Sequence, residues 1–133
     1  MKCLLVLPLD ASTRSLRDTV SRVLRENEVE PVGVDDTAKV TAGARWVDEI
    51  YGLLRSCDFV IADITRQNPN VVFQLGVAHG LGKPFIVLIS EGADSPSIPS
   101  FLSGYQFLVY DPKNFSGLVS RLGRVVQSMS RTV

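Results

Sequence analysis

The feature that most constrains the fold of this 133-residue chain is a series of five short apolar runs, separated by segments with helical periodicity. A continuous apolar run of four to eight residues is typical of a strand buried on both faces. Strands that alternate with helices favour a parallel sheet covered by helices on both sides. Strands are predicted over 3–9, 29–36, 58–64, 85–90 and 105–111, and helices around 16–24, 47–54, 70–81 and 115–129.

The fold class predicted from this order is α/β, a doubly wound, flavodoxin-like sheet with strand order 2-1-3-4-5. Its length suits a single domain spanning residues 1–133. Pro31 favours an edge position for the second strand or a place at its start, because proline cannot donate to a neighbouring strand. Ligands of such sheets bind at the carboxyl ends of the strands, near the switch point between strands one and three. The loops 8–14, 63–70 and 90–97 are therefore the expected site.

Composition excludes several classes of function. Lys and Arg together number 14, as do Asp and Glu, so duplex nucleic acid is not an expected partner. Cys3 and Cys57 form no disulfide framework or CxxC pair, which indicates reduced thiols in a cytoplasmic protein. A single His and two distant Cys do not favour a zinc site, and we expect no cofactor. The chain has no signal-peptide pattern or membrane-spanning run, so we expect no membrane partner.

The helix predicted over 70–81 carries an amide on its apolar face. Val71, Leu75 and Ala78 share this face with Gln74 at a period of 3.6 residues. A buried amide needs hydrogen-bond partners. Gln74 therefore has two possible roles: to bond backbone carbonyls of a neighbouring loop, or to contact a ligand at the start of the helix.

The loop before this helix offers polar side chains. Asp63 ends the third strand, where a carboxylate either holds ribose hydroxyls or caps the next turn. Thr65 and Asn68 follow in the same loop, and Ser90 ends the fourth strand. Asn70 is predicted to cap the helix, rather than to contact ligand.

The start of the first helix is a second candidate binding element. Its polar and flanking residues suit a phosphate cradle, although the segment lacks the glycines of a P-loop or dinucleotide fingerprint. Trp46 offers a ring that could stack on a base, although core packing is its expected role. His79 is interpreted as a satisfied core residue, since no acidic partner is near it in sequence. The candidate cradle comprises Leu9, Asp10, Ser12 and Arg14.

The segment "DFVIADITRQNPNVVFQLGVAHGLGKPFIVLI", residues 58–89, resembles a known family. It is similar to the nucleoside 2-deoxyribosyltransferase-like proteins and the related prokaryotic Toll/interleukin-1 receptor (TIR)-like nucleotide-binding proteins. Their pattern is a strand ending A-D-hydrophobic-T, then N-P-N-V, then E-L-G-x-A-H-x-L-G-K-P. Only the Glu differs here, where Gln74 stands. The segments "PLD", "VDEIYGLLRSC" and "IPSFLSGYQFLVYD" match more weakly.

The resemblance implies a site that cleaves or exchanges the bond between a base and a ribose, in NAD or in a nucleoside. The family Glu acts as nucleophile or stabilises positive charge at the anomeric carbon. The resemblance also implies that Asp63 contacts the sugar, that Asn68 and Asn70 belong to the loop before the catalytic helix, and that the chain forms a homo-oligomer.

A neutral amide supplies neither a charge nor a good nucleophile, so the chain as written is predicted to be inactive. Either Gln74 is natural and the domain is a non-catalytic nucleotide-sensing or effector module, or Gln74 replaces an original Glu. A phosphoacceptor receiver domain shares the strand order and would use Asp63, but the fifth strand ends without the required Lys.

Overall fold

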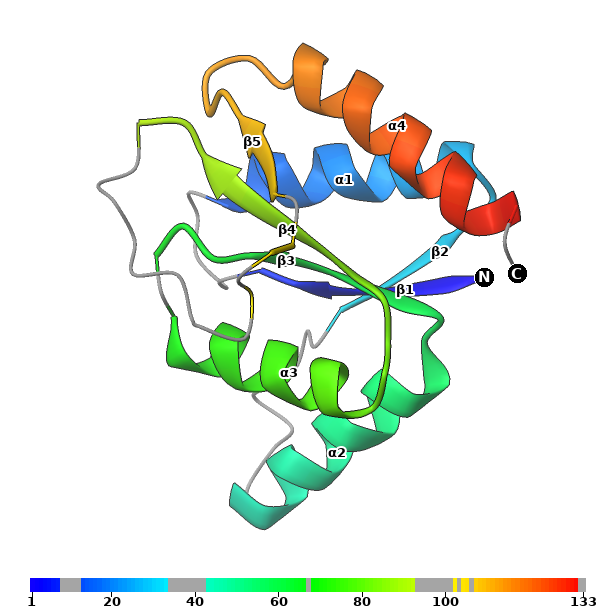
Figure 1. The fold of residues 1–133 in the computed structure, drawn as a ribbon, viewed down its shortest axis with the longest axis vertical. Coiled ribbons are helices and arrows are strands. Elements are labelled where there is room, and N and C mark those ends of the chain that lie inside the picture. The colour runs from blue at the N-terminus through cyan, green and yellow to red at the C-terminus, as the bar shows by residue number, and fades with distance from the viewer. Residues whose placement is uncertain are drawn as a thin grey trace.

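The computed structural model of the chain describes residues 1–7, 13–33, 43–66, 68–92, 102, 104–105 and 107–131, the side chains of 43–46 and 130–131 excepted. Strands and helices alternate through the first four strands, as the sequence predicts (Figure 1). In chain order the elements are β1 (Lys2–Val6), α1 (Arg14–Glu26), β2 (Glu30–Gly33), α2 (Gly43–Ser56), β3 (Phe59–Asp63), α3 (Pro69–Gly80), β4 (Phe85–Ser90), β5 (Phe107–Tyr110) and α4 (Ser116–Arg131).

The sheet has the strand order β2-β1-β3-β4-β5, and every pair of neighbours is parallel. This order confirms the predicted flavodoxin-like topology. Pro31 lies in β2, an edge strand, as its missing N–H requires. The register pairs Asp63 with Leu88 and Ser90 with Tyr110. The last residues of β3, β4 and β5 therefore come together at one end of the sheet.

Two helical layers enclose the sheet, α1 and α4 on one face and α2 and α3 on the other (Figure 1). Side chains of the central strands alternate between two hydrophobic clusters, because successive residues of a strand point to opposite faces. Phe59 and Ile61 of β3 face α1 and α4, whereas Val60 and Ala62 face the other layer. The same alternation directs Asp63 toward the α1 and α4 layer.

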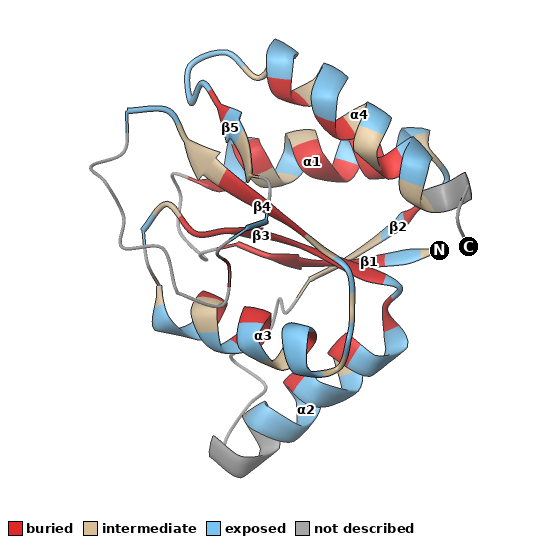
Figure 2. Ribbon diagram, in the orientation of Figure 1, coloured by how far each residue is buried: buried red, intermediate tan, exposed pale blue. Residues whose placement is uncertain are grey.

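Burial follows these layers. β3 is buried along its whole length, and each helix is buried only on its inward side (Figure 2). Some predicted strand ends were wrong: β1 ends at Val6, although Leu7 is also buried, and β5 begins at Phe107. Apolar runs overestimate strand length, because a residue beyond the last backbone pair can still fill the core. Residues 8–9, 34–36 and 106 of the predicted strands lie outside the described part.

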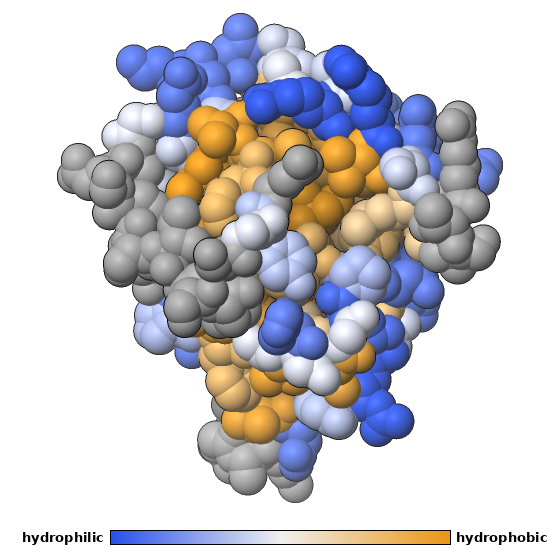
Figure 3. Space-filling model, in the orientation of Figure 1, coloured by the Kyte–Doolittle hydropathy of each residue, from blue (hydrophilic) through white to orange (hydrophobic). Residues whose placement is uncertain are grey.

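The edge of the sheet at β5 is partly exposed. Figure 3 shows apolar surface across the middle of the molecule, where β4 and β5 lie in Figure 1, and hydrophilic surface above it over α4. Val109 of β5 is 43% exposed, and Arg121 of α4 donates a hydrogen bond to its carbonyl. A cation placed over an edge strand disfavours pairing with another strand. None of the helices in the described residues is long and apolar enough to cross a membrane.

Candidate functional site

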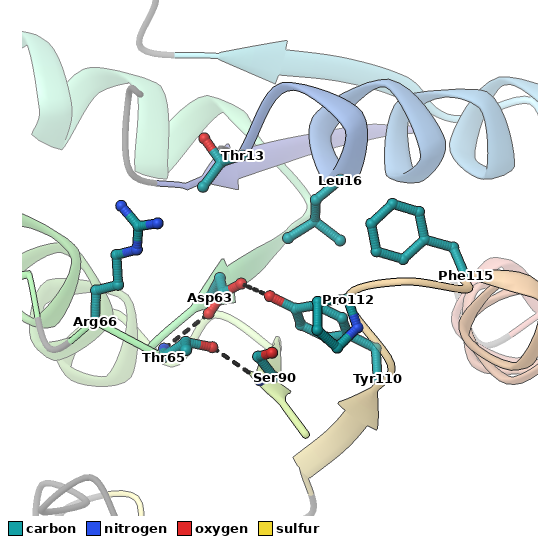
Figure 4. A pocket seen from close by; sticks show the side chains of 9 residues that line it. All are labelled: Thr13, Leu16, Asp63, Thr65, Arg66, Ser90, Tyr110, Pro112 and Phe115. Carbon is teal, nitrogen blue, oxygen red and sulfur yellow. Dashed lines mark hydrogen bonds between the residues drawn. The ribbon is translucent and has the colours of Figure 1, made fainter. Parts of the chain in front are cut away.

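A pocket of about 180 Å³ opens at the carboxyl ends of β3, β4 and β5, beside the start of α1 (Figure 4). This is the end of the sheet at which the sequence places the candidate site, and it is where doubly wound sheets bind ligands. One part of the lining is polar and the other is apolar. The lining residues are Thr13, Leu16, Asp63, Thr65, Arg66, Ser90, Tyr110, Pro112 and Phe115.

Asp63 occupies the buried part of the pocket, with only 3% of its surface exposed. The backbone N–H of Thr65 donates to Oδ1 of Asp63 at 2.7 Å, and the Tyr110 hydroxyl donates to Oδ2. The Thr65 hydroxyl oxygen accepts from the backbone N–H of Ser90 at 2.8 Å. Asp63 therefore caps the turn after β3, as one of its two predicted roles requires. Its carboxylate still faces the pocket, since Asp63 is among the lining residues.

Tyr110 is held in its neutral, hydrogen-donating form. Burial is the largest cause that raises the pKa of Tyr110 above its ordinary value, and the hydrogen bond and negative charge of Asp63 raise it further. The hydroxyls of Thr65 and Ser90 act in the opposite direction. A charged phenolate is disfavoured by burial and by a neighbouring carboxylate. Tyr110 consequently donates its hydrogen to Asp63 throughout the neutral pH range.

The apolar part of the lining comes from α1 and from the segment that joins β5 to α4. Leu16 is buried, and Phe115 lies with its ring centroid 6.0 Å from that of Tyr110. Arg66 is exposed and, in Figure 4, lies on the opposite side of Asp63 from Tyr110. Pockets that bury a drug-sized ligand measure about 300–1,000 Å³. This pocket is smaller, and its volume suits one ring of a larger ligand.

Gln74 lies in the other layer and does not line this pocket. It is 6% exposed and packs on α3 with the buried residues Val71, Leu75 and Ala78. Its Nε2 donates to the backbone carbonyl of Asn70 at 3.2 Å. Its Oε1 is buried and has no hydrogen-bond partner in the described part of the chain. The predicted bond to a backbone carbonyl is present, but the carbonyl belongs to the same helix rather than to a neighbouring loop.

The start of α3 corrects another prediction. Asn68, not Asn70, is the N-cap residue: its Oδ1 accepts from the backbone N–H of Asn70 at 2.8 Å. Pro69 follows at the first helical position, which tolerates a missing N–H. The prediction misplaced the cap by two residues because proline fits inside the first turn. Whether Asn68 or Asn70 also contacts a ligand stays a prediction.

The end of α3 is closed by a Schellman motif. The N–H of Gly82 donates to the carbonyl of His79 at 3.0 Å, and that of Lys83 to Ala78 at 2.9 Å. Gly82 adopts φ +70°, which glycine adopts without strain. The interpretation of His79 as a core residue was wrong: it is exposed, with Nδ1 3.3 Å from the Tyr105 hydroxyl.

The other predicted site residues divide into three groups. Thr65 and Ser90 line the pocket beside Asp63. Arg14 is exposed in the first turn of α1 and is not among the described lining residues. Residues outside the described part, wholly or in their side chains, are Leu9, Asp10, Ser12 and Trp46.

Sequence reasoning missed several lining residues, above all Tyr110. A usable signal was present: "YD" ends the fifth apolar run, so the tyrosine stands at the carboxyl end of a strand. The parallel register then brings it beside Ser90. Leu16 and Phe115 begin the helical segments predicted around 16–24 and 115–129, and only the structure shows that they border the pocket.

Comparisons with known proteins support the fold. No protein-family model matches the sequence, and no curated protein sequence matches it significantly. Several solved structures are similar over most of their length. The CMP N-glycosidase BcmB of Clostridium botulinum has a TM-score of 0.65 and 18% identity, over 92% of this chain and 98% of that one. The TIR domain of the Toll-related receptor TRR-2 from Hydra magnipapillata has a TM-score of 0.64 and 16% identity, over 94% and 97%.

A 2-deoxyribosyltransferase from Bacillus psychrosaccharolyticus is also similar, with a TM-score of 0.61 and 12% identity over 90% of each chain. These structures include a 2-deoxyribosyltransferase and a TIR domain, so this chain shares its fold with both of the groups that the motif in residues 58–89 resembles. The resemblance is thus confirmed at the level of the fold.

Proposed function

We propose that this chain is a nucleotide- or nucleoside-binding domain of the N-glycosidase type, in which Gln74 leaves the base–ribose chemistry inactive. The observation that carries the proposal is the pocket at the carboxyl ends of β3, β4 and β5, with Asp63 in its buried part. Parallel sheets of this topology bind ligands at this end. Similar folds in a CMP N-glycosidase and a 2-deoxyribosyltransferase support the same ligand class.

In this proposal the chain does not cleave the base–ribose bond because Gln74 stands in the position of the catalytic Glu. An amide is a very poor nucleophile and brings no negative charge to an oxocarbenium-like transition state. Gln74 is also held by its own helix, because Nε2 donates to the Asn70 carbonyl. A carboxylate in this position has no hydrogen to donate to that carbonyl.

A non-catalytic nucleotide-sensing or effector module is the second candidate. The hydrogen bond of the Gln74 amide favours it, since Nε2 donates to the Asn70 carbonyl and an ionised carboxylate cannot make this bond. In this case the ligand, NAD or a related nucleotide, acts as a signal, and assembly into a homo-oligomer is the proposed response.

Ligand binding and base release, measured on the same samples, test the proposal. Thermal shift is measured with NAD, ADP-ribose, nucleosides and nucleoside monophosphates, and chromatography follows the free base. The original chain is expected to bind at least one of these and to release no base. Base release by a folded Gln74→Glu variant supports the N-glycosidase type, with Gln74→Met as the uncharged control. Binding without release by either supports the sensing module, and no binding by any of them contradicts both.

A further inference from the structure

The buried end of the pocket presents the carboxyl group of Asp63, whose two oxygens are hydrogen-bond acceptors. Each oxygen of Asp63 already accepts one hydrogen, Oδ1 from the Thr65 backbone and Oδ2 from the Tyr110 hydroxyl. A carboxylate oxygen can accept more than one hydrogen bond, so Asp63 can still accept from a ligand. The Tyr110 hydrogen is committed to Asp63. The Ser90 hydroxyl lies 3.4 Å from the Glu91 carbonyl, to which it donates.

We propose that Tyr110 is a specificity-determining residue of this pocket: its hydrogen bond fixes the Asp63 carboxylate in place as an acceptor, which selects a flat ring bearing amine hydrogens. This inference rests on the proposed function, because it names the part of the nucleoside that enters the pocket. Tyr110 acts through Asp63 and is therefore a positioning residue.

The shape of the pocket favours a base over a ribose. Its volume of about 180 Å³ accommodates one ring rather than a whole nucleoside. Leu16, Pro112 and Phe115, together with the Tyr110 ring, supply an apolar wall. Aromatic rings stack on such surfaces, whereas a ribose is surrounded by hydroxyls that need partners. Amino-bearing bases combine an apolar face with edge hydrogens, which fits this wall and the Asp63 acceptor.

The Asp63 carboxylate discriminates between bases that carry an amine and bases that carry a carbonyl. A base that carries a carbonyl in place of its amine points an acceptor at Asp63, and two acceptors repel. Arg66, the other charged residue that lines the pocket, lies on the side away from Tyr110 (Figure 4). Without the Tyr110 hydroxyl, Oδ2 of Asp63 loses the hydrogen bond that fixes its position, so the carboxylate is free to turn away from the amine or from the carbonyl of the base. Tyr110→Phe is therefore expected to weaken the preference itself, beyond any change in overall affinity.

Matched ligand pairs test this inference on the full chain. Dissociation constants are measured by calorimetry for cytidine against uridine and for adenosine against inosine, since each pair exchanges an amine for a carbonyl. We expect the amino member to bind at least about tenfold more tightly, the factor for one hydrogen bond to a charged acceptor. The two pairs distinguish a pyrimidine from a purine pocket. Tyr110→Phe is expected to reduce the ratio to below about threefold.

Tyr51→Phe is the matched control, because Tyr51 lies exposed on α2 and is not among the described residues that line the pocket. It should keep the ratio of the original chain. If Tyr110→Phe fails to fold, Asp63→Asn replaces it, since an amide can turn its NH₂ group toward a carbonyl and is expected to bring the ratio to about one or invert it.

Equal or tighter binding of uridine and inosine by the original chain overturns the inference and leaves the proposed function standing. A ratio unchanged in Tyr110→Phe overturns the role of Tyr110. An absence of binding by every nucleoside and nucleotide overturns the inference and the proposed function together.

Discussion

Replacing Gln74 by Glu should make the stability of the fold depend on pH. Glu and Gln have nearly the same shape, so the change acts on hydrogens and charge. Below the ordinary Glu pKa of about 4.3, a protonated side chain can donate to the Asn70 carbonyl as the amide does. Ionisation removes this donor and leaves a charge at a position that is 6% exposed. The folded state therefore binds the proton more tightly than the unfolded state.

The sign and size of this pH dependence follow from the linkage between proton binding and folding. A carboxyl whose pKa is raised on folding contributes stability that is present below its unfolded pKa and is lost as pH rises toward its folded pKa. Each pH unit in this window costs about 1.4 kcal/mol. Between pH 4.5 and pH 7.5 the cost is then at most about 4 kcal/mol, close to that of an uncompensated buried charge. The free energy of unfolding of native domains is about 5–15 kcal/mol. The Gln74→Glu variant should therefore fold, but its free energy of unfolding should be measurably lower at neutral pH than at pH 4.5.

Urea denaturation of the original chain and of Gln74→Glu at pH 4.5, 5.5, 6.5 and 7.5 measures this difference. Gln74→Met is the control, since it removes the buried, unpartnered Oε1 without adding charge, and its difference from the original chain should be independent of pH. A pH-independent difference for Gln74→Glu would refute the reasoning. It would mean that the carboxylate finds a cation, a donor or water, and that the surroundings of Gln74 are open to solvent or ligand. The same titration identifies the pH at which base release by this variant is best assayed.

Three further outcomes are expected. Asn68→Ala should lower the free energy of unfolding by about 1 kcal/mol because it removes the N-cap of α3, whereas Asn70→Ala, which keeps the capped N–H, should change it by less than about 0.5 kcal/mol; urea denaturation measures both. Tyr110 should ionise above the ordinary tyrosine value of about pH 10, so its stabilising contribution is present below pH 10 and is lost as pH rises through its folded pKa. Asp63→Asn should lower the pKa of Tyr110, and an unchanged ultraviolet titration of phenolate would contradict the Asp63 contact. Gly82→Ala should cost about 1–2 kcal/mol through φ +70° alone, since an added Cβ meets no atom within 4 Å; an unchanged urea midpoint would speak against the Schellman geometry.

The sequence predicted the sheet because apolar runs and helical periodicity are local patterns. The strand order, the edge position of Pro31 and the burial of Gln74 all followed from them. The pocket depends on distant contacts, which these patterns do not contain. Asp63 and Tyr110 are 47 residues apart, and their hydrogen bond requires the parallel register of three strands. For the same reason the sequence grouped Gln74 with Asp63, although the structure assigns them to different layers.

Sequence motifs also predicted where a helix begins better than which residues contact one another. The segment "NPN" correctly marked the beginning of α3. The N-cap is the residue before the first helical residue, and because Pro69 is that first residue, the cap is Asn68 and not Asn70. The exposure of His79 could not be read from its spacing, because it lies at the margin of the apolar face, and Tyr105 contacts it from a distant part of the chain.

The contact between Tyr110 and Asp63 has a consequence for the dynamics of the sheet. β5 is an edge strand of the sheet, and edge strands fray more easily than central ones because they are paired on one side only. Fraying of β5 breaks the Tyr110 contact and removes one wall of the pocket. A molecule held by Asp63 and Tyr110 must therefore leave before the edge opens, so occupancy of the pocket and closure of the sheet edge reinforce each other. The domain would report a bound ligand as slower hydrogen exchange along β5, without a change of shape.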